Sequence, residues 1–144
     1  MKRGVCMRVR VYYMSQKGWA EAVAEAVAGT VGCPLESLLP AYMPENLELM
    51  FLGCEGLRAD RVTLSFIESL GPSRAKRAAL FHCGAGRGEA LEQMRGALSA
   101  RGVLVLEDAF AMPVRGLFGR GPKPAQLEDA RAFARASLKA AGRM

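Results

Sequence analysis

Residues 8–20 read Arg-Val-Arg-Val-Tyr-Tyr-Met-Ser-Gln-Lys-Gly-Trp-Ala, and this stretch decides the fold class. The β-branched and aromatic side chains of residues 8–14 are typical of a strand. Residues 15–18 are polar and include a glycine, so they predict a short loop. Apolar residues then repeat every four positions from Trp19 to Val27, as in an amphipathic helix. A strand that runs through a short loop into a helix is the first half of a βαβ unit.

The same alternation of strand and helix continues to the end of the chain. Further strands are expected at about residues 35–39, 47–53, 77–83 and 103–112. The apolar spacing of Phe66–Leu70, Leu91–Leu98 and Leu127–Leu138 predicts helices between and after them. Five strands interleaved with helices predict an α/β protein with a parallel sheet that is covered by helices on both faces.

Length and composition indicate one globular domain. The chain has 144 residues, of which 51% are hydrophobic and 24% are charged, and this excludes a disordered or low-complexity chain. No internal repeat or linker is visible, so we expect a single domain over residues 1–144. Residues 1–6 precede the first strand pattern and are expected to be a dispensable N-terminal extension.

The cysteines and the hydropathy pattern indicate the compartment. The four cysteines, Cys6, Cys33, Cys54 and Cys83, form no CxxC pair and have no zinc-finger partners, so we expect reduced thiols, no metal site and a cytoplasmic location. Arg8 and Arg10 interrupt any signal-peptide core, and no apolar stretch is long enough to span a bilayer.

The net charge of +6 is unevenly distributed along the chain. Residues 1–20 carry five basic side chains and no acidic one, whereas residues 21–57 carry six Glu and no base. The remaining residues, 58–144, carry fifteen bases and eight acids. No basic helix with interleaved aromatic residues is present, so nucleic acid is not an expected partner.

Ligands of an open α/β sheet bind beyond the carboxyl ends of its strands, where the strand order reverses. Three loops are therefore candidates, at residues 15–18, 53–60 and 83–88. In the first, Ser15 offers a hydroxyl group, Lys17 offers a charge, and the start of the helix offers free amide groups to an anion such as a phosphate. An ordinary βα turn without a ligand remains the alternative on these residues alone.

Residues ~8–140 resemble the flavodoxin family in the joint order of their segments. Residues 9–20 stand where that family has its first strand and phosphate loop, and residues 51–54 end the third strand. The segment Ala79-Leu80-Phe81-His82-Cys83-Gly84-Ala85-Gly86 is similar to the strand and glycine-rich loop that border the flavin ring. Residues 64–70 and 124–134 are similar to later helices of the family.

The resemblance implies a flavodoxin-like three-layer sandwich with strand order 2-1-3-4-5 and bound FMN. It implies an electron-transfer role in which FMN does the chemistry and a redox partner protein exchanges the electrons. The cofactor-binding residues that it implies lie in the three loops: Ser15, Gln16, Lys17, Gly18, Trp19, Ala20, Cys54, Glu55, Gly56, Cys83, Gly84, Ala85 and Gly86.

The phosphate loop departs from the family pattern Ser/Thr-x-Thr-Gly-Asn-Thr. Lys17, Trp19 and Ala20 replace two hydroxyl groups and an amide, and each lost hydrogen bond to a phosphate would cost about 1.5–3 kcal/mol. The second and third loops supply no aromatic side chain to stack on a flavin. Trp19 could stack on a ligand, although packing is the commoner role of an aromatic residue that starts a helix.

Two further functions therefore stay open beside the FMN-binding electron carrier. One is a cofactor-less flavodoxin-like module that binds other proteins, and the other is a small FMN-dependent reductase of a quinone or another organic acceptor. Whether the chain is an enzyme in its own right is left open, with no catalytic residue assigned.

Cys54 and Cys83 end neighbouring strands and could form a redox-active thiol pair, although a buried cysteine is usually a small apolar residue. His82 is expected to be a hydrogen-bonded buried histidine. Residues 114–123 mix basic, glycine and aromatic residues and could contact an anionic partner, although such a connection is more often only a loop.

Overall fold

The computed structural model describes residues 7–39, 42–86, 88–113 and 122–143. Its strands are β1 (Val9–Tyr13), β2 (Leu35–Ser37), β3 (Leu49–Glu55), β4 (Arg77–Cys83), β5 (Leu104–Val105) and β6 (Phe110–Met112). Its helices are α1 (Trp19–Val31), α2 (Arg61–Glu68), α3 (Glu89–Ala100) and α4 (Pro124–Gly142). The expected extension at residues 1–6 lies outside the described residues.

The strands form one parallel sheet in the order β2-β1-β3-β4-β5, as the resemblance implied, with β6 also paired to β4. The expected last strand, 103–112, is divided into two short strands. β5 pairs with the start of β4 at Arg77 and Ala78, and β6 pairs with its end at residues 81–83. The exposed, charged pair Glu107-Asp108 lies between them, which suits a bulge in the edge of a sheet better than a buried ladder.

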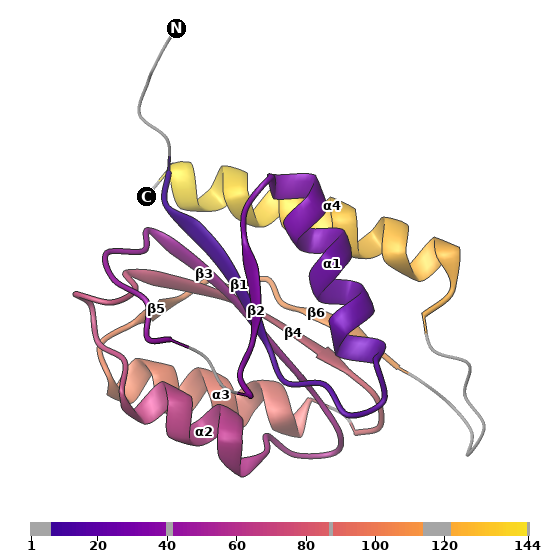
Figure 1. Ribbon diagram of the computed structural model, residues 1–144, viewed down its shortest axis with the longest axis horizontal. Coiled ribbons are helices and arrows are strands. Elements are labelled where there is room, and N and C mark those ends of the chain that lie inside the picture. Colours follow the sequence, from indigo (N-terminus) through magenta and orange to yellow (C-terminus); the bar gives the residue numbers. More distant parts are fainter. Residues whose placement is uncertain (1–6, 40–41, 87, 114–121, 144) are drawn as a thin grey trace, which may run out of the picture.

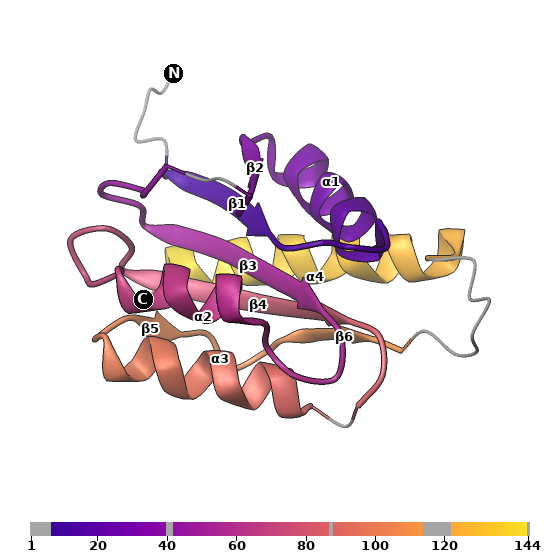
Figure 2. The same cartoon turned by 60° about the horizontal axis from the view of Figure 1, so that its bottom comes forward.

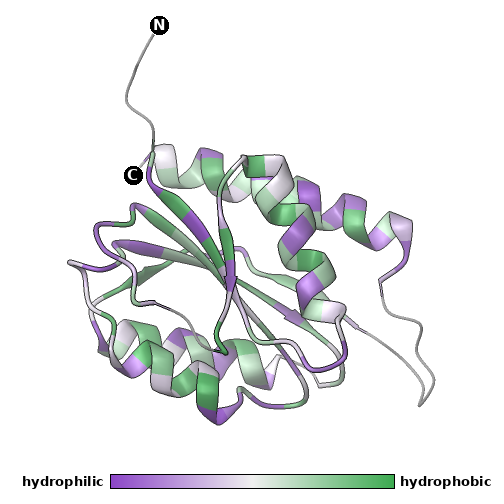
Figure 3. Cartoon of the chain, in the orientation of Figure 1, coloured by the Kyte–Doolittle hydropathy of each residue, from purple (hydrophilic) through white to green (hydrophobic). Residues whose placement is uncertain are grey.

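Helices cover both faces of the sheet (Figures 1 and 2). α1 and α4 lie together on one face, and α2 and α3 lie on the other. The central strands β3 and β4 are buried along nearly their whole length, and most of their residues are hydrophobic (Figure 3). A strand buried on both faces needs a continuous apolar run, which is what residues 49–54 and 78–83 provide.

The pleat divides these strands into two sets of side chains. Even-numbered residues of β1, β3 and β4, such as Tyr12, Leu52 and Leu80, pack toward α2 and α3. Odd-numbered residues, such as Phe51 and Phe81, pack toward α1 and α4. Because successive side chains of a strand alternate between faces, this parity also fixes where the residues at the strand ends point.

Gly29 and Pro124 both lie within helices. α1 continues through Gly29 and stops at Gly32, which has a positive φ of 78°. Gly29 is exposed and has open space around it, so the helix tolerates it. Pro124 is the first residue of α4, as suits a residue without an amide hydrogen.

Among the helices of the described residues, none combines the length and the apolar character that crossing a bilayer requires. Of the loop expected at 114–123, residues 114–121 lie outside the described part of the chain.

Candidate functional site

A pocket of about 530 Å³ opens at the carboxyl ends of β1, β3 and β4. It lies at the point where strand order reverses, because β2 and β3 lie on opposite sides of β1. This is the position at which ligands of open α/β sheets bind, and the volume is within the range of small-molecule sites. The lining residues are Met14, Gln16, Lys17, Trp19, Glu55, Gly56, Arg58, Asp60, Gly84 and Ala85.

The first loop turns directly into α1 at Gly18. This glycine is the N-cap residue and has a positive φ of 86°, which glycine adopts without strain. A Cβ at this position would meet no atom within 4 Å, so the backbone conformation, and not a close approach, requires glycine here. The Ser15 hydroxyl oxygen accepts from the amides of Gly18 (3.1 Å) and Glu21 (3.2 Å) and so ties the loop to the first turn of the helix.

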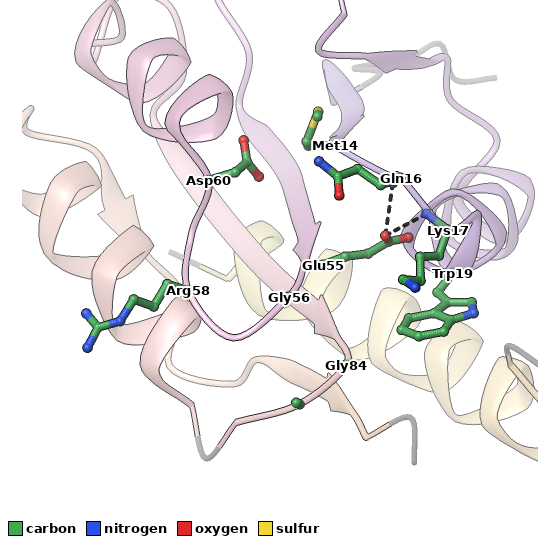
Figure 4. A pocket seen from close by; sticks show the side chains of 10 residues that line it. Met14, Gln16, Lys17, Trp19, Glu55, Gly56, Arg58, Asp60 and Gly84 are labelled. Atoms are coloured by element: carbon green, nitrogen blue, oxygen red, sulfur yellow. Dashed lines mark hydrogen bonds between the residues drawn. The ribbon is translucent and has the colours of Figure 1, made fainter. Parts of the chain in front are cut away.

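The Glu55 carboxylate lies in the centre of this loop (Figure 4). Its Oε1 accepts from the backbone amides of Gln16 and Lys17, both at 2.9 Å. Its Oε2 accepts from the amide of Ala20 at 2.8 Å and from the Ser15 hydroxyl at 2.5 Å. Four donors from one βα turn therefore converge on a single carboxylate that comes from a neighbouring strand.

The position of Glu55 follows from the parity of β3. Glu55 is the last residue of that strand and has the same parity as Phe51, so it points to the face covered by α1. On the β1 side of the sheet, Gly53 pairs with Tyr13, the last residue of β1. The position beside Glu55 therefore lies beyond the end of that strand. Glu55 therefore extends past the end of β1, where the loop and the amino end of α1 lie.

The loop keeps Glu55 ionised. Burial raises the pKa of the Glu55 carboxyl group, but the hydrogen bonds from Ser15 and from the amides of Ala20, Lys17 and Gln16 favour the charged form. The net result is a pKa below the ordinary value. The positive end of the α1 dipole lies at the same place, where a negative charge is stabilising.

Lys17 and Trp19 form the wall of the pocket beside the loop. The Lys17 ammonium group lies over the Trp19 ring, 5.7 Å from its centroid, in a cation–π contact. Trp19 is half-buried and packs against the core cluster beneath α1 and α4. Its expected packing role is therefore confirmed, while one part of the ring still lines the pocket.

The second loop caps α2 and contacts the third loop. Asp60 is the N-cap of α2, and its Oδ1 accepts from the amide of Thr63 at 2.7 Å. The Gly56 amide donates to the Cys83 carbonyl oxygen at 3.3 Å. A Cβ on Gly86 would lie 3.0 Å from Leu57 Cδ1, so the two loops touch along their length.

The two thiols and the histidine at the strand ends do not form a common reactive group. Cys54 packs toward α3, with its sulfur 4.0 Å from that of Met94, whereas Cys83 belongs to the core on the α1 side. Burial raises the pKa of each thiol to about 12, so both are unreactive near neutral pH. The His82 ring nitrogen Nε2 is hydrogen-bonded to the Gly56 carbonyl oxygen, which confirms the expected buried and satisfied histidine.

The three expected loops thus meet around one pocket. Of the thirteen residues predicted from the sequence, Gln16, Lys17, Trp19, Glu55, Gly56, Gly84 and Ala85 line it. Ser15, Gly18 and Ala20 shape the loop behind it. Cys54 and Cys83 point into the two cores, and Gly86 packs against the second loop.

The sequence prediction missed three further lining residues, Met14, Arg58 and Asp60. Met14 directly follows β1, so its place at the strand end was a usable signal. Asp60 stands three residues before Thr63 at the start of a helical pattern, which is typical of an N-cap residue. Arg58 extends away from the pocket centre in Figure 4; it belongs to the candidate loop 53–60 but was not among the thirteen predicted residues.

No protein-family model matches the sequence, and no curated protein matches it at a significant level. Solved structures show the fold. Flavodoxin 1 from Bacillus cereus superposes with a TM-score of 0.72 at 18% identity, over 92% of this chain and 97% of that one. A flavodoxin from the domain Archaea gives 0.70 at 14% identity, over 94% and 99%.

Rubredoxin oxygen:oxidoreductase from Desulfovibrio gigas gives a TM-score of 0.70 at 19% identity. It is matched over 94% of this chain but only 37% of its own length, so this chain corresponds to about a third of that protein. The chain therefore has a flavodoxin-like fold.

The residues of the site fit the two parts of FMN unequally. The pocket offers an apolar wall and open volume to a flat ring. The anion position of the loop, by contrast, is already filled by the Glu55 carboxylate. A phosphate could not receive the same amides while Glu55 holds them, so the terminal phosphate does not fit this loop as it stands.

Proposed function

We propose that this protein is a flavodoxin-like electron-transfer protein that binds a flavin ring in the pocket formed by its three loops. The proposal rests on one observation: a pocket of about 530 Å³ lies at the reversal of strand order in a flavodoxin-like sheet. This is the place where the fold holds FMN in its well-known members. Flavin chemistry belongs to the ring, and the protein supplies its binding, orientation and degree of exposure.

The walls of the pocket suit a flat aromatic ligand. Trp19 and Met14 contribute apolar surface to the pocket, and Gly56 and Gly84 line it without side chains. Electron exchange would take place with a redox partner protein that docks at the open side of the pocket.

The sole tryptophan of the chain reports on this pocket directly. Riboflavin and FMN are each added to the purified protein, and Trp19 fluorescence, flavin fluorescence and the melting temperature are recorded. A flavin that binds only the native state at one hundred times its Kd stabilises it by about 2.7 kcal/mol. Saturable quenching with a raised melting temperature is expected for at least one flavin. If neither flavin changes any of the three signals at millimolar concentration, the proposed function is wrong.

The second candidate is a flavodoxin-like module that binds other proteins without a cofactor. The contact between the second and third loops favours it, because Leu57 and Gly86 narrow the space between these loops. Leu57 is also 53% exposed, as a residue that contacts another protein would be in the free chain. This candidate predicts no response to either flavin in the experiment above.

A further inference from the structure

The side chain of Glu55 provides the anion that the first loop is built to hold. A βα turn of this kind offers several amide groups and the positive end of a helix to a negatively charged group. In this protein the amides of Gln16, Lys17 and Ala20 all donate to one carboxylate, at 2.8–2.9 Å. The loop is therefore satisfied within the chain.

The hydrogen bonds around the carboxylate form a closed set. Ser15 donates to Glu55 and accepts from the amides of Gly18 and Glu21. Five backbone amides between residues 16 and 21 thus already have acceptors, either Glu55 or the hydroxyl group that is bonded to it. A second anion at this position would have to displace Glu55.

Electrostatic repulsion from Glu55 also disfavours a phosphate at this position. A phosphate monoester carries close to two negative charges at neutral pH, and it would lie within a few ångströms of an ionised carboxylate. The nearest loop cation, Lys17, has its ammonium group over the Trp19 ring. In the described residues it makes no ion pair with Glu55 that would reduce the carboxylate's charge.

We infer that Glu55 is an internal substitute for a ligand phosphate, so that the site selects flavins without a terminal phosphate over FMN. The choice of flavins as the ligand class rests on the proposed function, whereas the exclusion of phosphate rests on the loop alone. The loop serves to hold β3, the first turn of α1 and the pocket wall together, and no longer to bind the end of a ligand.

The test compares riboflavin with FMN, because they differ only in the phosphate. The wild-type protein is expected to bind riboflavin at least tenfold more tightly than FMN. In Glu55→Ala, which frees the loop amides, the ratio of FMN affinity to riboflavin affinity should rise at least tenfold. The matched control is Glu25→Gln, which removes a negative charge from the exposed face of α1. It should leave the ratio of the two affinities unchanged.

Inorganic phosphate provides a second readout that needs no flavin. Millimolar phosphate should raise the melting temperature of Glu55→Ala and not that of the wild type, with equal concentrations of chloride salt as the reference. Glu55→Ser, whose side chain is too short to reach the loop amides, is used in the same comparison if Glu55→Ala does not fold.

The outcomes separate the two proposals. Phosphate stabilisation that appears only in the Glu55 variants, together with no flavin binding by any variant, would refute the flavin proposal and support the role of Glu55. Wild-type protein that binds FMN more tightly than riboflavin would overturn the inference, even though flavin binding itself would be established. An FMN-to-riboflavin ratio that Glu55→Ala leaves unchanged would overturn it as well.

Discussion

Replacing Glu55 by Gln should destabilise the protein by about 1.5–3 kcal/mol at pH 7. Gln retains one carbonyl oxygen, which can still accept from the amides of Gln16 and Lys17. Its amino group then faces the amide of Ala20 and the hydroxyl of Ser15, where the second carboxylate oxygen accepted two hydrogen bonds. A hydrogen bond to a charged group contributes about 1.5–3 kcal/mol, so two lost bonds set an upper limit of about 3–6 kcal/mol. Glu55 is only half-buried, and solvent screening reduces that value by about half.

The difference in stability between the wild type and Glu55→Gln should disappear in acid, because the folded protein lowers the pKa of Glu55. The unfolded chain takes up a proton on this carboxyl group near pH 4.5, at a higher pH than the folded protein does. The contribution of Glu55 is therefore complete above about pH 4.5 and is lost as the pH falls through the folded-state pKa. The difference between the wild type and Glu55→Gln should be constant from pH 6 to 8 and shrink below pH 4.5.

Urea unfolding at a series of pH values measures this difference, with Glu25→Gln as a charge-matched control on the exposed face of α1. A destabilisation of about 1.5–3 kcal/mol corresponds to a melting temperature lower by about 5–10 °C for a chain of this size. The control should stay within about 0.5 kcal/mol of the wild type. A Glu55→Gln variant that is as stable as the control at pH 7, or whose deficit grows in acid, would refute the assigned role of Glu55.

Three further outcomes are expected. Cys54 and Cys83 should resist alkylation at pH 8 in the folded protein, as followed by mass spectrometry of peptides, because burial raises both pKa values to about 12; rapid labelling without unfolding would contradict the described burial. Gly53→Ala should cost about 1–3 kcal/mol or more in urea unfolding, because its Cβ would overlap a fully buried phenylalanine ring. Gly29→Ala, in an open helical position, should instead raise the free energy of unfolding by about 0.5–1 kcal/mol. If Gly53→Ala and Gly29→Ala had similar effects, the described packing around Gly53 would be wrong. Asp60→Ala should cost about 0.5–2 kcal/mol through the lost N-cap of α2, and a neutral effect would argue against the cap.

Much of the fold could be predicted from periodicity alone. The strand expected at residues 77–83 has the same bounds as β4, and the helix that follows the first loop begins at Trp19, where the apolar repeat begins. These elements are buried on one or both faces, so packing imposes a clear pattern on their sequence. The expected strand at 103–112 was less well predicted, because an edge strand can be interrupted without leaving a buried core unfilled.

The location of the site was also predictable, since loops at the carboxyl ends of parallel strands must converge. Whether the anion position of the first loop is free or occupied was not predictable. Glu55 was among the expected cofactor-binding residues, but a sequence does not show that its carboxylate occupies the loop for which a phosphate was expected. The usable signal was the alternation of side chains along β3. Glu55 ends this strand and points to the same face as Phe51, which is the face where α1 begins. Assigning that face requires the exact strand bounds and register, which sequence patterns give least reliably.

The most direct test of the claim that Glu55 fills the anion position is a pH titration of the backbone amides by ¹H–¹⁵N NMR. The amide resonances of Gln16, Lys17 and Ala20 should move together as the pH is lowered from 7 to 3, with one shared midpoint below 4.5. Adding inorganic phosphate at pH 7 should leave these resonances in place. Amide resonances that ignore the titration of Glu55, or that shift saturably with phosphate at pH 7, would contradict the claim.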